Sequence, residues 1–351
     1  MASHLEDIMR ASLRRDMEKH QRLAQQQATP RGFCLKVSGM PLRARAAMKS
    51  CKRHRDRAGT TSSQQSENAV SLDETWPARV LAALSSVLQQ LERTPQQQED
   101  AAANESMSAS TASALRSVTG IELRHCGLRA DNLCTKDHGA TGAVSLADIV
   151  LAPQRLWNLT TQLVPPPACV SLTTLDLECN EVGDDGVQLL CSGLLLHLRG
   201  LRRLLLASNK ITAAGLLFMS SASQRQGGGD LPPNLDTLGL TNNPLGAQAR
   251  GTVQAHPSED DWCDAFRTLV SHLSSLRRIH LNHAGLSTRE LACVLHTVRE
   301  CLAERSQPCV FDTIYLRENH LANKAEALSL LRDKVEDQSA LDTFLALHVS
   351  M

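Results

Sequence analysis

The chain has 351 residues, no net charge and an aromatic content of only 3%, with a single tyrosine. This length allows a sizeable core, which must be built mainly from aliphatic side chains. The charge is uneven, because residues 1–60 carry 14 Lys and Arg against 5 Asp and Glu, so the remainder is acidic by the same amount. No apolar run approaches the roughly 18 residues of a membrane span, and the first residues do not resemble a signal peptide. We therefore expect a soluble intracellular protein without membrane contact, whose eleven cysteines stay reduced.

The first 60 residues predict a largely disordered basic arm. Apolar side chains recur at near-helical spacing over 3–27, which predicts a helix there. A basic cluster follows, consisting of Arg43, Arg45, Lys49, Lys52, Arg53, Arg55 and Arg57. A solvated arm is the simplest interpretation; a nuclear-import signal or weak phosphate contact with nucleic acid is the alternative. The cluster holds no aromatic residue, so base stacking is not expected.

Residues 61–114 are mostly of low complexity and predict a linker. They contain one clear helical pattern over 77–93, in which apolar residues form a single stripe that ends at Thr94-Pro95. A stripe of this kind must be buried. We expect the helix to cap the open edge of the domain that follows, with binding in a groove of a partner as the alternative.

From about residue 115 an apolar pattern recurs six times, starting at 118, 172, 201, 235, 276 and 311. Each copy holds two apolar residues two positions apart, and a turn residue follows three positions after the second of them. The turn positions are Cys126, Asn180, Asn209, Asn243, Ala284 and Asn319. Residues two apart in a strand point the same way, so each copy predicts a short strand with one buried row. The intervals between copies range from 29 to 54 residues, so several repeats carry insertions.

The turn residues predict how the strands end. An Asn side chain can satisfy backbone groups that the turn leaves unpaired, and Cys126 can serve as a small buried group. Ala284 cannot hydrogen-bond through its side chain, so its turn should be looser or use another partner. Helical patterns follow the turns; Ser287 with Glu290 predicts a capping box, and Asn323 predicts another helix start.

Residues 172–186, LTTLDLECNEVGDDG, followed by LRRLLLASNKI at 201–211, resemble the ribonuclease-inhibitor class of leucine-rich repeats. Ran GTPase-activating proteins and many intracellular adaptors share this class. The resemblance covers roughly 115–345 and implies an α/β leucine-rich-repeat solenoid over 115–351, with about six repeats. In such a solenoid a curved parallel sheet lies inside and helices lie outside. The resemblance is specific for the fold and unspecific for the function.

The predicted partner-binding site is the concave face of this sheet. It should expose the residues that flank the buried strand positions: Glu122, Arg124, Asp176, Glu178, His280, Asn282, Tyr315 and Arg317. Tyr and Arg dominate interface energetics, so Tyr315 and Arg317 are the expected anchors, while the middle of the face is small and smooth. The alternative is that these are ordinary solvated strand residues.

No catalytic residue, cofactor, metal or small-molecule substrate is predicted. Two histidines and two cysteines near His280 crowd one stretch, but their spacing fits no common zinc pattern. We therefore predict a non-catalytic scaffold or adaptor that binds a protein, in the cytoplasm or, through the basic arm, in the nucleus. The resemblance also implies a small GTPase as an alternative partner, with GTPase activation as the alternative function. The chain ends in an apolar segment, 341–351, rather than the acidic tail of Ran GTPase-activating proteins.

Overall fold

A computed structural model describes most of the chain from residue 118 onward and three earlier parts. The described residues are 11, 15 and 22, and the ranges 33–38, 76–88, 118–134, 144–151, 172–224, 231–246, 257–304, 311–319, 321–333, 335 and 337–351. The predicted helix over 3–27 lies outside them, apart from three single helical residues. The basic cluster over 43–57 and most of the predicted linker also lie outside them.

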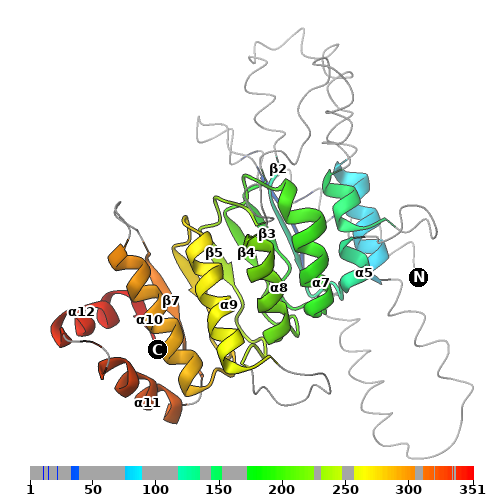
Figure 1. The fold of residues 1–351 in the computed structure, drawn as a ribbon. Helices are drawn as coiled ribbons and strands as arrows, with labels where there is room; N and C mark the ends of the chain where they lie inside the picture. Colours follow the sequence, from blue (N-terminus) through cyan, green and yellow to red (C-terminus); the bar gives the residue numbers. More distant parts are fainter. Residues whose placement is uncertain are drawn as a thin grey trace, which may run out of the picture.

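The described strands form one parallel sheet in which every strand pairs with its neighbour in sequence (Figure 1). The strands are β1 (Phe33–Ser38), β2 (Val118–Arg124), β3 (Thr174–Asp176), β4 (Arg203–Leu205), β5 (Thr237–Gly239), β6 (Arg278–His280), β7 (Thr313–Tyr315) and β8 (Val349–Ser350). The register aligns the same repeat position across the sheet; Leu175, Leu204 and Leu238, for example, are consecutive partners. This sequential parallel order confirms the α/β class, and β2 to β7 are the six strands predicted from the sequence.

Helices cover one side of the sheet and stand side by side in Figure 1. They are α5 (Ala130–Leu133), α7 (Gly183–Leu189) with a π turn (Leu190–Leu194) and a 3₁₀ turn (Leu195–His197), α8 (Ala213–Gln224), α9 (Glu259–His272), α10 (Thr288–Glu304), α11 (Leu321–Arg332) and α12 (Gln338–His348). Two further helices span 76–88 and 146–151. The sheet therefore has a helical side and an opposite side, which we call the sheet face.

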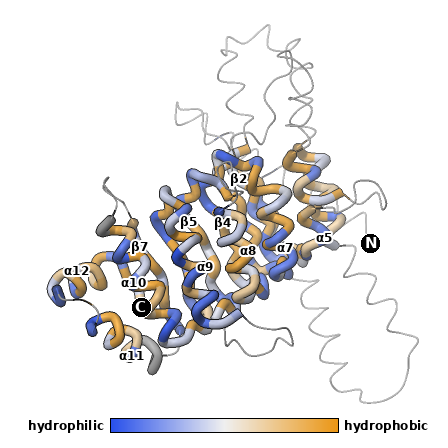
Figure 2. The backbone as a smooth tube through the Cα atoms, in the orientation of Figure 1, coloured by the Kyte–Doolittle hydropathy of each residue, from blue (hydrophilic) through white to orange (hydrophobic). Residues whose placement is uncertain are grey.

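The core lies between the sheet and the helices. It is a single cluster of buried, almost entirely aliphatic side chains that runs from Leu35 to Phe344. Its large aromatic residues are Trp262 and Phe266 of α9, whose rings stack at 5.4 Å, and Trp76, Phe311 and Phe344. Figure 2 shows hydrophobic and hydrophilic positions alternating along the helices, as expected for helices with one buried side. The core is thus filled mainly by aliphatic side chains, as expected from the low aromatic content of the sequence.

The turn asparagines hold neighbouring repeats together. Asn180 accepts hydrogen bonds from the N–H groups of Cys126 and Leu128 at 2.9 and 3.1 Å, and donates to the carbonyls of Leu123 and Leu177 at 2.7 Å. Asn209, Asn243 and Asn319 bind the preceding turn in the same way. All four are buried, so their amides satisfy backbone groups that water cannot reach. The role predicted for these residues is confirmed by these contacts.

Ala284 interrupts this ladder, and its backbone takes over part of the task. Its carbonyl accepts from the N–H groups of Leu245 and Gly246 at 3.0 and 3.2 Å. In the preceding repeats, the N–H group that corresponds to Leu245 bonds to an Asn side chain instead, as Val182 does to Asn209. The alternative hydrogen-bond partner expected at this turn is therefore the main-chain carbonyl of Ala284 itself.

The turns also share a strained backbone position. The residue before each turn position has a positive φ between 52° and 60°, although none of these residues is glycine: His125, Cys179, Ser208, Asn242, His283 and Glu318. The left-handed region costs a residue with a Cβ about 1 kcal/mol or more. The hydrogen bonds of the turn must offset that cost in every repeat.

The structure differs from the sequence analysis at the N-terminal edge. Residues 33–38, assigned to the arm, form β1, with Leu35 and Val37 opposite Ile121 and Leu123. The strand was missed because its turn position holds Met40 instead of Asn or Cys, and because it lies in the basic region. The helix over 76–88 buries its apolar stripe in the common core, so the domain begins well before residue 115. The stripe is thus occupied within the chain and is not free for a partner's groove.

Smaller features of the C-terminal half were predicted with mixed success. The capping box of Ser287 and Glu290 is present, with bonds of 2.7 and 3.2 Å. The helix start predicted at Asn323 is wrong, because α11 already begins at Leu321, directly after the turn. The final residues of the chain add the short strand β8 beside β7. Within the described ranges, no helix combines the length and the apolar character needed to cross a bilayer.

Candidate functional site

The middle of the sheet face is hollowed. The hollow has a volume of about 360 Å³ and lies across β4, β5 and β6 and the turns next to them. Its lining consists of Arg124, Glu178, Arg203, Leu205, Ala207, Thr237, Gly239, Thr241, Arg278 and His280. The depth follows from the small side chains at its centre, above all Gly239, whose position would bring an added Cβ to 2.9 Å from Leu205. Three of the eight residues predicted for partner binding, Arg124, Glu178 and His280, line it, and the other five do not.

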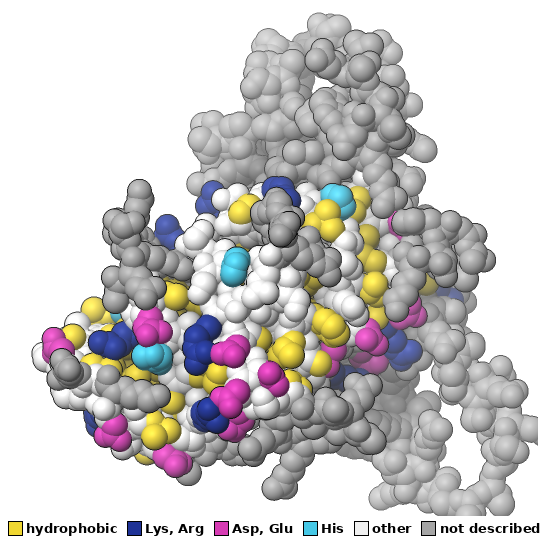
Figure 3. Space-filling view, in the orientation of Figure 1, with side chains coloured by type: hydrophobic (Ala, Val, Ile, Leu, Met, Phe, Trp, Pro, Cys, Tyr) yellow, Lys and Arg dark blue, Asp and Glu magenta, His cyan; other side chains and the backbone are white. Residues whose placement is uncertain are grey.

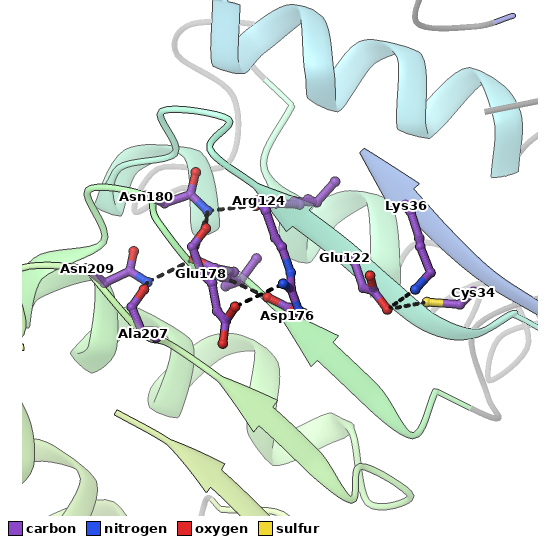
Figure 4. A network of polar contacts seen from close by, with 11 residues as sticks. Cys34, Lys36, Glu122, Arg124, Asp176, Glu178, Asn180, Ala207 and Asn209 are labelled. Carbon is purple, nitrogen blue, oxygen red and sulfur yellow. Dashed lines mark hydrogen bonds and ion pairs between the residues drawn. The ribbon is translucent and has the colours of Figure 1, made fainter. Parts of the chain in front are cut away.

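A charged network borders the hollow on the N-terminal side (Figure 4). Arg124 binds the carboxylate of Asp176 through Nε at 2.7 Å, and its Nη1 lies 3.2 Å from Glu178. Asp176 is only 1% exposed, whereas Arg124 is 41% exposed. Burial and the nearby charge of Asp176 raise the pKa of Glu178, against the opposing effect of Arg124. Asp176 therefore positions Arg124, and the accessible groups are Arg124 and Glu178.

A second polar cluster ties β1 to β2. Lys36 forms an ion pair of 2.7 Å with Glu122, and the thiol of Cys34 donates to the same carboxylate at 3.3 Å. Burial opposes ionisation of Glu122, but the bonds from Lys36 and Cys34 outweigh it and lower its pKa. Burial and the charge of Glu122 raise the pKa of Cys34 to about 12. Glu122 is thus engaged in holding the edge strand and contributes little free charge to the sheet face.

Rings and polar groups border the hollow on the C-terminal side. The rings of His280 and Tyr315 stack at 4.3 Å, with 15° between their planes. Asn282 accepts from the backbone N–H of Arg317 at 2.7 Å, and the Arg317 side chain donates to Ser350 at 3.1 Å. Burial, followed by the charges of Arg278 and Arg203, lowers the pKa of His280 and favours its neutral form. His280, stacked on Tyr315, forms part of one wall of the hollow.

Three residues of the hollow, Arg203, Thr237 and Arg278, were not predicted from the sequence. The two arginines occupy equivalent positions in β4 and β6, and each is paired in register with Thr237 of β5. These positions lie two residues before Leu205 and His280, and therefore on the same face of the sheet. Extending the strand alternation by one step toward the N-terminus would have found both arginines.

The helical side of the sheet is a weaker candidate for a binding surface than the sheet face. Figure 3, which views the molecule from that side, shows acidic and basic side chains interspersed over the helices, with hydrophobic side chains scattered among them. Several charged side chains of the helices pair with each other, such as Arg267 with Asp264 and Arg289 with Asp260. A surface of alternating charges without a large apolar patch is typical of solvated helices.

The histidines and cysteines near His280 are dispersed by the fold. His280 is in β6, His296 pairs with Glu300, and the Cys293 thiol donates to the carbonyl of Cys263 at 3.7 Å. Among the described residues, no three His, Cys, Asp or Glu side chains gather closely enough to hold a metal ion.

Comparison with known proteins agrees with this geometry. Residues 168–191, which include β3, Asn180 and α7, match a family model described as a leucine rich repeat. The chain thus contains a leucine-rich repeat, and its parallel sheet with outer helices is consistent with a leucine-rich-repeat solenoid. The comparison with curated proteins found no match for the chain.

Proposed function

We propose that this protein is a non-catalytic interaction module that binds a protein partner on the sheet face. The observation that carries the proposal is the hollow over β4 to β6, bordered on both sides by ordered polar and aromatic groups. A leucine-rich repeat fits a role in protein interaction. A preformed surface of this kind lowers the entropy that binding costs, because its side chains are already held in place.

The two borders differ in what they offer a partner. On the C-terminal border, Tyr315 is held against His280, and Arg317 is exposed beside it. Tyr and Arg are the residue types that most often anchor interfaces, and a preordered ring costs little on binding. On the N-terminal border, Arg124 and Glu178 present one donor and one acceptor group whose orientation Asp176 supports. We therefore expect the binding energy to come mainly from the C-terminal border.

The test uses the full chain as bait in a quantitative pull-down. Tyr315→Ala combined with Arg317→Ala should remove partners that the wild type retains. Arg267→Ala combined with His272→Ala is the matched control, since both residues are exposed on the helical side of α9. The thermal midpoint of each variant shows whether it is folded. An unchanged set of partners for a folded Tyr315 and Arg317 variant would reject the proposal.

A further inference from the structure

Arg203 and Arg278 form a pair of cations across the hollow. Both sit in register with Thr237, so their Cα atoms are separated by two strand spacings, or about 10 Å. An arginine side chain spans much of that distance, so both guanidinium groups can reach one ligand group between them. Thr237 between them is buried, and its hydroxyl is already used by Asp236 at 2.7 Å. The floor between the two arginines is therefore the buried Thr237, with the carboxylate of Asp236 next to it.

The two arginines differ from Arg124 in how far their charge is neutralised. Arg124 is bound by two carboxylates, Asp176 and Glu178. Arg278 lies 3.9 Å from Asp312, and both side chains are more than 40% exposed, so solvent weakens that pair. Within the described part of the chain, no carboxylate lies within ion-pair distance of Arg203, which is exposed. Arg203 and Arg278 are thus less closely paired than Arg124, although the lining also holds Glu178, whose charge interacts with that of Arg203.

The floor of the hollow leaves room for a ligand. Gly239 has no side chain, the side chain of Ala207 is small, and Leu205 is almost fully buried. Thr241 and His280 complete the lining on the C-terminal side of this floor. A hollow of about 360 Å³ accommodates one or two side chains and not a folded domain.

We propose that the hollow binds a segment of the protein partner that carries Asp or Glu side chains, with Arg203 and Arg278 as its anchors. The inference rests on the proposed function and names the partner's chemistry. Guanidinium groups bind carboxylates through two parallel N–H donors, which gives the contact direction as well as charge. A nucleic acid is disfavoured, because a hollow of about 360 Å³ holds one or two anionic groups and not a continuous row of phosphates.

The test measures fluorescence anisotropy of a labelled peptide of alternating Glu and Ser titrated with the full-length protein. Arg203→Gln combined with Arg278→Gln should weaken binding roughly tenfold, or about 1.4 kcal/mol. The matched control is Arg202→Gln combined with Arg277→Gln. These two exposed residues directly precede the same two strands and do not line the hollow, and their replacement changes the net charge by the same amount. The control should bind like the wild type.

A second variant tests the shape of the hollow and leaves its charge unchanged. Ala207→Phe fills the floor, so it should weaken the Glu peptide to a similar degree. Equal affinity of the two double variants would overturn the proposal, because binding would then reflect overall charge, including that of the basic arm. Binding of a phosphoserine peptide alone, without the Glu peptide, would overturn it too.

The pull-down separates this inference from the proposed function. If the partners depend on Tyr315 and Arg317 but the Glu peptide does not depend on Arg203 and Arg278, the sheet face binds a partner and the acidic anchor is wrong. If the partners are unaffected by Tyr315 and Arg317, the proposed function fails, whatever the peptide does.

Discussion

Asn243→Ala tests the asparagine ladder directly. Asn243 is fully buried and makes four hydrogen bonds of 3.1 Å or less. Its oxygen accepts from the N–H groups of Asn209 and Ile211, and its amide donates to the carbonyls of Leu206 and Leu240. The substitution leaves all four backbone groups without these partners in a place that water does not reach. The side chain thus joins two neighbouring repeats inside the core.

The expected loss follows from these bonds. A net contribution of about 1 kcal/mol for each gives about 4 kcal/mol. The turn of Ala284 shows that a carbonyl can replace one of them, which reduces the expected loss of unfolding free energy to about 3 kcal/mol. For a domain of this size, that corresponds to a fall of roughly 6–12 °C in the thermal midpoint.

Urea and thermal unfolding followed by circular dichroism at the helical signal provide the measurement. Asn234→Ala is the control, since Asn234 is exposed and donates one 3.0 Å bond to the carbonyl of Arg199. That control should lose less than about 1 kcal/mol. A loss below about 1 kcal/mol for Asn243→Ala would refute the argument that buried asparagines hold the repeats together.

Three further changes are predicted. Arg124→Gln should lower the free energy of unfolding by about 2 kcal/mol, because it leaves the buried carboxylate of Asp176 without a cation. Glu122→Gln should make stability fall less steeply between about pH 5 and pH 3, measured as the urea midpoint at each pH. The lowered pKa of Glu122 means that its charge stabilises the folded state above the unfolded pKa, and this contribution is lost as pH falls through the folded pKa. Glu318→Gly should raise the thermal midpoint, with a gain of about 0.5 kcal/mol, because glycine adopts its φ of 60° without strain.

Each of these has its own counter-result. For the charged network, Arg129→Gln is the comparison, since its pair with Glu181 is largely exposed; equal losses for both arginines would contradict the role of burial. For Glu122, identical pH profiles of wild type and variant would show that β1 is held by packing alone. For Glu318, a lower midpoint would mean that the side chain contributes more than the backbone strain costs.

The repeat architecture could be predicted from the sequence because the pattern within each repeat is enough to indicate its strand and turn. Leu204 and Leu206, with Asn209 three positions on, determine a buried strand row and a turn without reference to distant residues. β1 could not be found in this way, because Met40 stands at its turn position and the strand is recognisable only through its partner β2. The ribonuclease-inhibitor class within the leucine-rich repeats stays a prediction.

The candidate site could be predicted only in part from the sequence. Strand alternation placed Arg124, His280 and Tyr315 on one face, as the structure has them. Which of these charges remain free depends on contacts between repeats, and the spacing within one repeat does not contain that information. Asp176 looks exposed in the sequence and is buried, because Arg124 of the preceding strand folds over it.

The pairing of β1 with β2 also determines where the sheet should open first. Phe33 and Val118 are partners across 85 positions, whereas the β3 and β4 partners Thr174 and Arg203 are 29 positions apart. Closing the longer segment costs about 1 kcal/mol more in chain entropy. Local unfolding should therefore start with the detachment of β1. The backbone N–H and C=O groups of β2 would then be unpaired at the edge of the sheet, where a strand of another molecule could bind.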